Sequence, residues 1–180
     1  MKEEQTKKDL AQALLLLMEH ASLEKITIND IVTKCGVSRQ TFYRHFKDKY
    51  DLVNWYFEIQ VQKSFAIIKD SSTLKEALTK KFEFINEQYV FFHNAFLIDN
   101  YNSLVNYDYN YIYHFYESII QQKTGSISEE IRFTLEFYCH ASIDMTVDWV
   151  LHNRPIQPSI IAQRLVELMP KKLEALLLEL

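Results

Sequence analysis

The sequence predicts an all-α protein, because turn-forming residues are scarce and the apolar residues have helical spacing. The 180 residues include two Gly and three Pro, far below average usage, so tight turns must be few. Apolar residues recur every three or four positions along most of the chain, as in helices with one buried face. Hydrophobic residues make up 48% and charged residues 24%, which is ordinary for a globular protein. We therefore expect about nine helices.

The first three helices are predicted from apolar spacing and capping residues. Apolar positions within 5–21 give the first helix. Thr27, with Asp30 three residues later, forms an acidic capping box, and Gly36 should end that short helix. Ser38 is a suitable N-cap for the next one. Two short helices joined across a glycine turn predict a helix-turn-helix.

The later helices follow from the same apolar spacing. They are expected from Lys49 onward, at 72–97 with a break near His93–Asn94, through the tyrosine-rich stretch to Lys123, at 128–152, and at 158–179.

The tyrosine-rich stretch at 106–116, "NYDYNYIYHFY", alternates like a strand when it is taken alone. Over the longer window 103–122 the apolar residues recur at three and four, and a lone strand would leave its edges unpaired. The helical interpretation is therefore favoured. It predicts that Tyr111, Phe115 and Tyr116 point inward, by default as core residues.

Charge is distributed unevenly between the two ends of the chain. Residues 1–50 contain nine Lys/Arg against seven Asp/Glu, whereas residues 51–180 contain eleven against seventeen. A basic first part on an acidic body indicates that only the first part approaches a polyanion. We expect a helix-turn-helix domain that binds a polyanion at 1–49 and a separate helical domain at 50–180.

The sequence also predicts a cytoplasmic protein. Its two cysteines are far apart, and no signal peptide is recognisable at the N-terminus. No apolar run approaches the length of about 18 residues that a membrane span needs.

The second helix of a helix-turn-helix lies in the major groove, where its first residues reach base edges. Arg39 can form a bidentate contact with guanine, Gln40 with adenine, and Thr41 can meet a thymine methyl group or a phosphate. The side chains suited to phosphate contacts are Tyr43, Arg44, His45 and Lys49. The alternative is a helical hairpin of an unrelated bundle whose charges are merely solvated.

The stretch "ITINDIVTKCGVSRQTFYRHFKDKYDL" resembles the DNA-binding domain of TetR/AcrR transcriptional regulators. The resemblance covers the whole three-helix domain and continues into a fourth helix. It implies a DNA-binding domain at 1–49 and a regulatory and dimerisation domain at 50–180. It also implies a homodimer, built from the helices at about 128–152 and 158–179, that binds a palindromic DNA operator. The residues that it implies for DNA contact are Thr27, Arg39, Gln40, Thr41, Tyr43, His45 and Lys49, with Ser38 capping the reading helix.

The remainder of the chain resembles more loosely the C-terminal domain of the TetR subgroup that includes the dihydroxyacetone kinase activator DhaS. That resemblance rests on "FINEQYVFFHNAFL" and "EFYCHASIDMTVDWVLHNRP". It leaves two modes of control open: a small-molecule effector, or a protein coactivator that docks on the C-terminal domain. The residues that fit a dimer face in the helix at 128–152 are Leu135, Tyr138, Cys139, Ser142, Ile143, Thr146, Trp149 and Val150.

Aromatic and apolar residues of the C-terminal part are candidates for an effector pocket. They are Phe92, Phe96, Tyr111, Phe115, Tyr116, Cys139 and Ile143. We expect no cofactor and no metal; a zinc site would have to draw on His93, His114, His140 and Asp144, which lack a recognised ligand spacing.

We also expect no enzyme activity. A catalytic centre of Cys139, His140 and Asp144 is disfavoured, because adjacent helical residues point about 100° apart and cannot readily pair as nucleophile and base.

Overall fold

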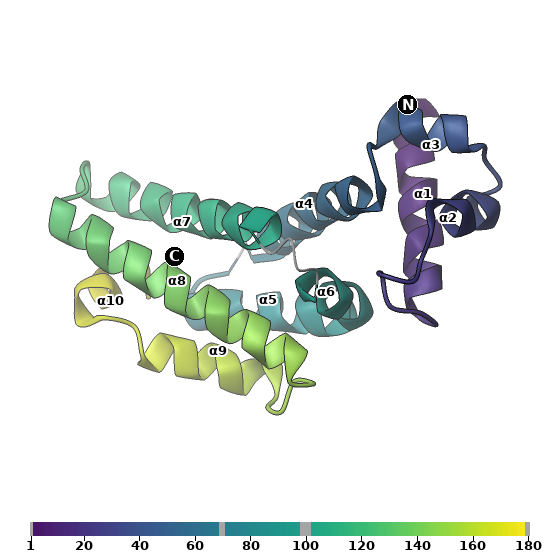
Figure 1. Cartoon of the computed structure of the whole chain (residues 1–180). Coiled ribbons are helices and arrows are strands. Elements are labelled where there is room, and N and C mark those ends of the chain that lie inside the picture. The colour runs from purple at the N-terminus through teal and green to yellow at the C-terminus, as the bar shows by residue number, and fades with distance from the viewer. Residues whose placement is uncertain (1, 69–70, 98–101, 179–180) are drawn as a thin grey trace. The chain divides into compact units, whose positions relative to one another are not determined.

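The computed structural model describes residues 2–68, 71–97 and 102–178 (Figure 1). Its described residues contain ten α-helices, which confirms the all-α prediction with slightly more helices than expected. The chain divides into two compact units: an N-terminal unit of residues 1–60 and 90–104, and a C-terminal unit of residues 61–89 and 105–180. None of the helices described is long and apolar enough to cross a membrane.

The N-terminal unit is built around a small helical core. It contains α1 (Lys2–Met18), α2 (Ile28–Cys35), α3 (Arg39–His45), the first part of α4 (Lys49–Ile68) and most of α6 (Tyr89–Phe96). Helix α2 packs against both α1 and α3. The predicted apolar spacing of the first helix is confirmed, since Leu10, Leu14 and Met18 are buried.

The C-terminal unit is a bundle of longer helices. It contains the end of α4, α5 (Leu74–Glu87), α7 (Asn102–Thr124), α8 (Glu129–Leu151), α9 (Pro158–Glu167) and α10 (Lys171–Leu177). Helix α5 packs on α9 and α10 on α8 (Figure 1). In its core, the Phe82 and Trp149 rings meet edge to face with centroids 5.2 Å apart.

Two predicted helix boundaries were wrong. The helix at 72–97 breaks at Gln88, not at His93–Asn94, which lie inside the continuous α6. The expected helix at 158–179 is divided into α9 and α10. Pro170 precedes α10, and a proline removes an amide donor and disfavours helical geometry in the residue before it.

The tyrosine-rich stretch is helical, as predicted, and lies within α7. Tyr116 is buried, and Tyr111 and Phe115 are half-buried.

The dimer face that we predicted on the helix at 128–152 was wrong. Its residues lie in the C-terminal unit's own core: Leu135, Tyr138, Cys139, Ile143, Thr146, Trp149 and Val150 are buried. The large apolar side chains that α8 exposes are instead Phe133, Phe137 and Met145. Apolar residues occur on both faces of this helix, so periodicity alone did not distinguish the face turned to the core.

Candidate nucleic-acid interface and ligand groove

Helix α2 begins and ends at the residues that the sequence predicted. The Thr27 hydroxyl accepts a hydrogen bond from the Asp30 amide at 3.2 Å, and the Thr27 amide donates to the Asp30 carboxylate at 2.8 Å. Hydrogen bonds from the Thr27 hydroxyl and amide lower the pKa of Asp30. Gly36, with φ 74°, takes the left-handed conformation that ends the helix. The turn into α3 is therefore specified locally.

Helix α3 is held by a cap at its start and by aromatic packing along one face. The Ser38 hydroxyl accepts a hydrogen bond from the Thr41 amide at 3.1 Å. Phe42 and Phe46 are buried, with ring centroids 5.9 Å apart. These contacts fix which face of α3 is turned to solvent.

The solvent face of α3 carries the side chains expected to contact DNA. Arg39, Gln40, Tyr43 and Arg44 are exposed, and Thr41 is half-buried. The Arg39 guanidinium lies 5.8 Å from the centre of the Tyr43 ring and donates a hydrogen bond to its hydroxyl at 3.3 Å. At the start of α3 this surface presents the guanidinium of Arg39 and the side-chain amide of Gln40. Such groups bind base edges and phosphates in protein–DNA complexes.

Lys47 extends this basic surface and was missed by the sequence prediction. It is exposed and lies two residues after the end of α3. Its position in the short connection before α4 was the available signal.

Lys49 has a structural role that the sequence did not indicate. Its ammonium donates hydrogen bonds to the carbonyls of Leu23, Glu24 and Ile26 at 2.7, 2.9 and 2.8 Å. A lysine has three donors, so all of them bind the segment between α1 and α2. Contact with DNA phosphate stays a prediction for Lys49, and it would compete with these bonds.

His45 is also turned inward. Its side chain is 3% exposed, and its Nδ1 lies 3.9 Å from a carboxylate oxygen of Glu3. Among the described residues, Nδ1 has no hydrogen-bond partner. A phosphate contact by His45 therefore stays a prediction that would require the ring to move outward.

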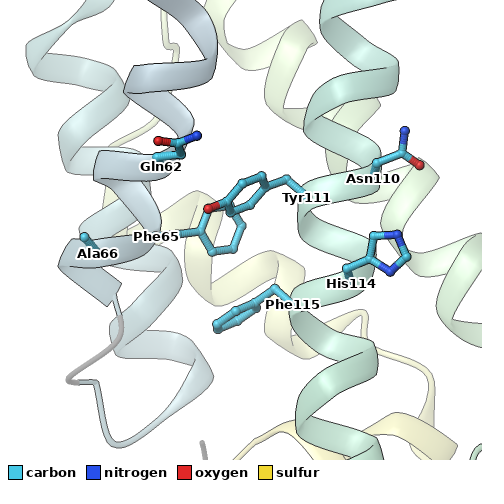
Figure 2. Close-up of a pocket in the computed structure, with 7 residues that line it drawn as sticks. All are labelled: Gln62, Phe65, Ala66, Asn110, Tyr111, His114 and Phe115. Atoms are coloured by element: carbon cyan, nitrogen blue, oxygen red, sulfur yellow. The ribbon is translucent and has the colours of Figure 1, made fainter.

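In the C-terminal unit, an open groove of about 690 Å³ lies between the end of α4 and α7 (Figure 2). Its lining is mostly apolar. The Phe65 ring of α4 lies 4.7 Å from the Tyr111 ring and 5.0 Å from the Phe115 ring, centroid to centroid. The lining residues are Gln62, Phe65, Ala66, Asn110, Tyr111, His114 and Phe115.

The structure brings together three of the seven predicted pocket residues. Tyr111 and Phe115 line the groove, and Tyr116 lines a smaller cavity that also includes Phe115. The other four do not line either space. Cys139 and Ile143 are buried in α8, while Phe92 and Phe96 pack on Phe57 in the N-terminal unit. Sequence reasoning missed Phe65, although its helical spacing in α4 was visible.

The residues considered for zinc do not assemble into a site. His140 stacks on the Tyr109 ring at 4.3 Å, and His114 lies 3.1 Å from the Glu117 carboxylate. Asp144 is exposed, and His93 belongs to the N-terminal unit. Within the described ranges, no three His, Cys, Asp or Glu residues are placed to hold a metal ion.

Cys139 is unsuited to nucleophilic chemistry. Burial raises the pKa of its thiol to about 12, so the thiol is protonated at neutral pH, whereas the thiolate is the reactive form.

Comparison with protein families agrees with both parts of this structure. The family described as "Bacterial regulatory proteins, tetR family" matches residues 7–54. The family described as "Transcriptional regulator C-terminal region" matches residues 72–171, more than half of the chain. The chain belongs to the TetR family of transcriptional regulators. It is thus a DNA-binding regulator and not an enzyme.

Individual relatives support the same assignment. The "HTH-type dhaKLM operon transcriptional activator DhaS" of Lactococcus lactis is 31% identical over 97 residues, which are 52% of this chain. The match spans 50% of the length of that relative.

Solved structures show the same fold. The "Dihydroxyacetone kinase operon activator DhaS" matches with a TM-score of 0.70 and 21% identity, over 97% of this chain and 98% of the other. The regulator FadR from Bacillus subtilis, solved in complex with stearoyl-CoA, matches with a TM-score of 0.63 and 18% identity, over 91% and 97%.

Proposed function

We propose that this protein is a homodimeric TetR-type regulator that binds a palindromic operator in the major groove through α3 and is controlled through its C-terminal unit. The observation that carries the proposal is the exposed face of α3. Arg39 and Gln40 stand at the start of a helix that is capped by Ser38 and anchored by the buried Phe42. The same proposal places the protein in the cytoplasm, with the DNA.

The predicted contacts divide into base-reading and positioning contacts. Arg39 and Gln40 would read bases, each bidentate pair contributing roughly 1–3 kcal/mol of discrimination. Tyr43, Arg44 and Lys47 would hold phosphates, which fix the position of the helix without reading sequence.

The exposed apolar side chains of α8 and α9 support a dimer. Phe133 and Phe137 are 71% and 65% exposed, and they are four residues apart and so on one face of α8. Ile160 is exposed on α9, and Leu168 is exposed just after the end of that helix. Large aromatic side chains exposed together mark an interface. A second copy related by a two-fold axis would cover this face and carry the two reading helices to half-sites about 34 Å apart.

The groove between α4 and α7 supports control by a small-molecule effector. Its volume and apolar lining match those of ligand sites in general, and a structural relative was solved with stearoyl-CoA bound. A protein coactivator is the second candidate. It is favoured by the open form of the groove, which a partner's side chains could enter, and by the similarity to an operon activator.

Footprinting and sedimentation test the proposal together. We expect the purified protein to protect two half-sites about one helical turn apart in the DNA upstream of its own gene. Changing Phe133 and Phe137 to Ser should yield monomers with weakened operator binding, whereas Leu16→Ser, at an exposed apolar residue of α1, should leave the dimer intact. Absence of any sequence-specific protection would refute the proposal.

A further inference from the structure

A second, smaller cavity, called the inner cavity below, lies in the C-terminal unit and is lined mainly by core residues of α5, α7 and α8. Its volume is about 20 Å³, room for about one water molecule. Phe65 and Phe115 line both the groove and this cavity. Their two rings therefore form the wall that separates the inner cavity from the open groove.

Two hydrogen-bond donors in the lining of the inner cavity lack partners. Lys81 is 7% exposed and Tyr116 is 4% exposed. Within the part of the chain that the structure describes, neither side chain forms a hydrogen bond or an ion pair. The ammonium of Lys81 and the hydroxyl of Tyr116 can therefore both donate hydrogen bonds to a ligand.

Neighbouring hydroxyl groups, in contrast, are satisfied by the protein. The Tyr138 hydroxyl donates to the Leu165 carbonyl at 3.0 Å, and the Thr146 hydroxyl donates to the Ser142 carbonyl at 2.7 Å. Of the polar side chains that line the inner cavity, Ser142 and Thr146 donate to backbone carbonyls, whereas Lys81 and Tyr116 form no hydrogen bond among the described residues.

Asp108 does not neutralise Lys81 by direct contact. It is buried, and no ion pair within 4.0 Å joins it to Lys81 among the described residues. Burial raises the pKa of Asp108, and the charge of Lys81 offsets only part of that rise. Among the described residues, Lys81 therefore has no carboxylate within ion-pair distance, and its ammonium can bind another anion.

We infer that Lys81 and Tyr116 form a subsite for the carboxylate of an acidic amphiphile whose apolar body lies in the groove against Phe65, Tyr111 and Phe115. This inference rests on the proposed control by an effector and names the chemical class of that effector. A carboxylate presents two acceptor oxygens to the two donors. It is also the smallest common organic anion, which suits a narrow cavity better than a phosphate does.

Entry of the carboxylate would couple the subsite to α4. The Phe65 and Phe115 rings must turn aside to join the groove and the inner cavity. Phe65 lies on α4, the helix that continues from the C-terminal unit into the N-terminal unit. A ligand that displaces Phe65 therefore acts on the helix that follows the DNA-binding helices.

Calorimetric titration with two ligands of equal chain length, decanoate and decan-1-ol, tests the inference. The wild-type protein should bind decanoate at least about tenfold more tightly than the alcohol, the effect of a charge-assisted hydrogen bond. Lys81→Met should abolish the preference for decanoate without weakening the binding of decan-1-ol. Tyr116→Phe should reduce the preference. Lys75→Met, the same substitution at an exposed residue of α5, should leave it unchanged.

The outcomes separate this inference from the proposed function. Failure to bind decanoate, equal affinities for the acid and the alcohol, or an undiminished preference in Lys81→Met would overturn the carboxylate subsite. Operator binding by the wild-type protein is measured in parallel without ligand. If the protein binds DNA specifically but shows no preference for the acid, only the carboxylate subsite is refuted. If it does not bind DNA specifically, the proposed function is refuted.

Discussion

In the N-terminal unit the polar side chains proposed to act in function point outward from α3, whereas in the C-terminal unit they point into the core. Arg39 and Gln40 are exposed on a helix that caps and aromatic packing already fix. Lys81 and Tyr116 are buried behind two aromatic rings without partners. The DNA-reading surface is therefore formed before it meets its target, while the ligand subsite must open. This difference suits a regulator in which ligand binding changes the conformation of the protein and the DNA binds one of the conformations.

The largest effect is expected from Phe42, which holds the reading face in place. Phe42→Ala should lower the free energy of unfolding of the N-terminal unit by about 3–5 kcal/mol, since it leaves a cavity in a small core. Urea unfolding followed by circular dichroism measures the loss. The decanoate preference of the C-terminal unit should persist, and a loss of stability below about 1 kcal/mol would show that α3 is held by other contacts.

Lys49 and Lys47 form a matched pair that separates a structural lysine from a DNA-contacting one. Lys49→Ala leaves three carbonyls without their donor and should destabilise the N-terminal unit by about 1–3 kcal/mol. Lys47→Ala should leave stability unchanged but reduce the salt dependence of operator binding by about one charge. Thermal unfolding and fluorescence anisotropy at several salt concentrations measure the two effects. If Lys49→Ala were fully stable, its hydrogen bonds to the loop would be dispensable.

A smaller effect is expected at Ser38, whose hydroxyl caps α3. Ser38→Ala should cost about 1 kcal/mol of stability. Ser22→Ala, at an exposed serine before α2, is the matched control and should change stability by less than half as much. Equal effects of the two substitutions in urea unfolding would argue against the cap as a stabilising contact.

Replacing Asp108 tests, through the pH dependence of stability, whether burial raises the pKa of this carboxyl group. Its pKa is raised on folding, so ionising it costs stability as pH rises from the unfolded value of about 3.9 through the higher folded value. Asp108→Asn should therefore stabilise the protein by roughly 1 kcal/mol at neutral pH, and the gain should vanish towards pH 4. Unfolding curves across this range measure it. A gain that grew as the pH fell would have the wrong sign.

Features specified by neighbouring residues were predictable from the sequence. The caps Thr27 and Ser38 and the left-handed Gly36 each depend on residues within three positions, and α7 was evident once the window exceeded the tyrosines. The residue types on the exposed face of α3 were also predictable, because the buried spacing of Phe42 and Phe46 fixes the opposite face.

Features specified by distant contacts were not predictable in the same way. The carbonyls bound by Lys49 lie 23 to 26 residues away in the chain. The break at Gln88 carries no Gly or Pro; the apolar residues on its two sides, such as Ile85 and Phe91, belong to the cores of different units. Lys81 was missed, although it falls on the apolar face of α5 with Ala77, Leu78 and Ile85. A lysine at such a position is the signal that would have found it.

The most direct test of the account is the ratio of two dissociation constants, for the operator and for a scrambled DNA of equal length, at one salt concentration. We expect the wild-type protein to prefer the operator by about a thousandfold or more. Changing Arg39 and Gln40 together to Ala should reduce this ratio by at least about tenfold. Lys47→Ala should weaken binding to both DNAs and preserve the ratio. An unchanged ratio in the double variant would contradict the assignment of α3 as the reading helix.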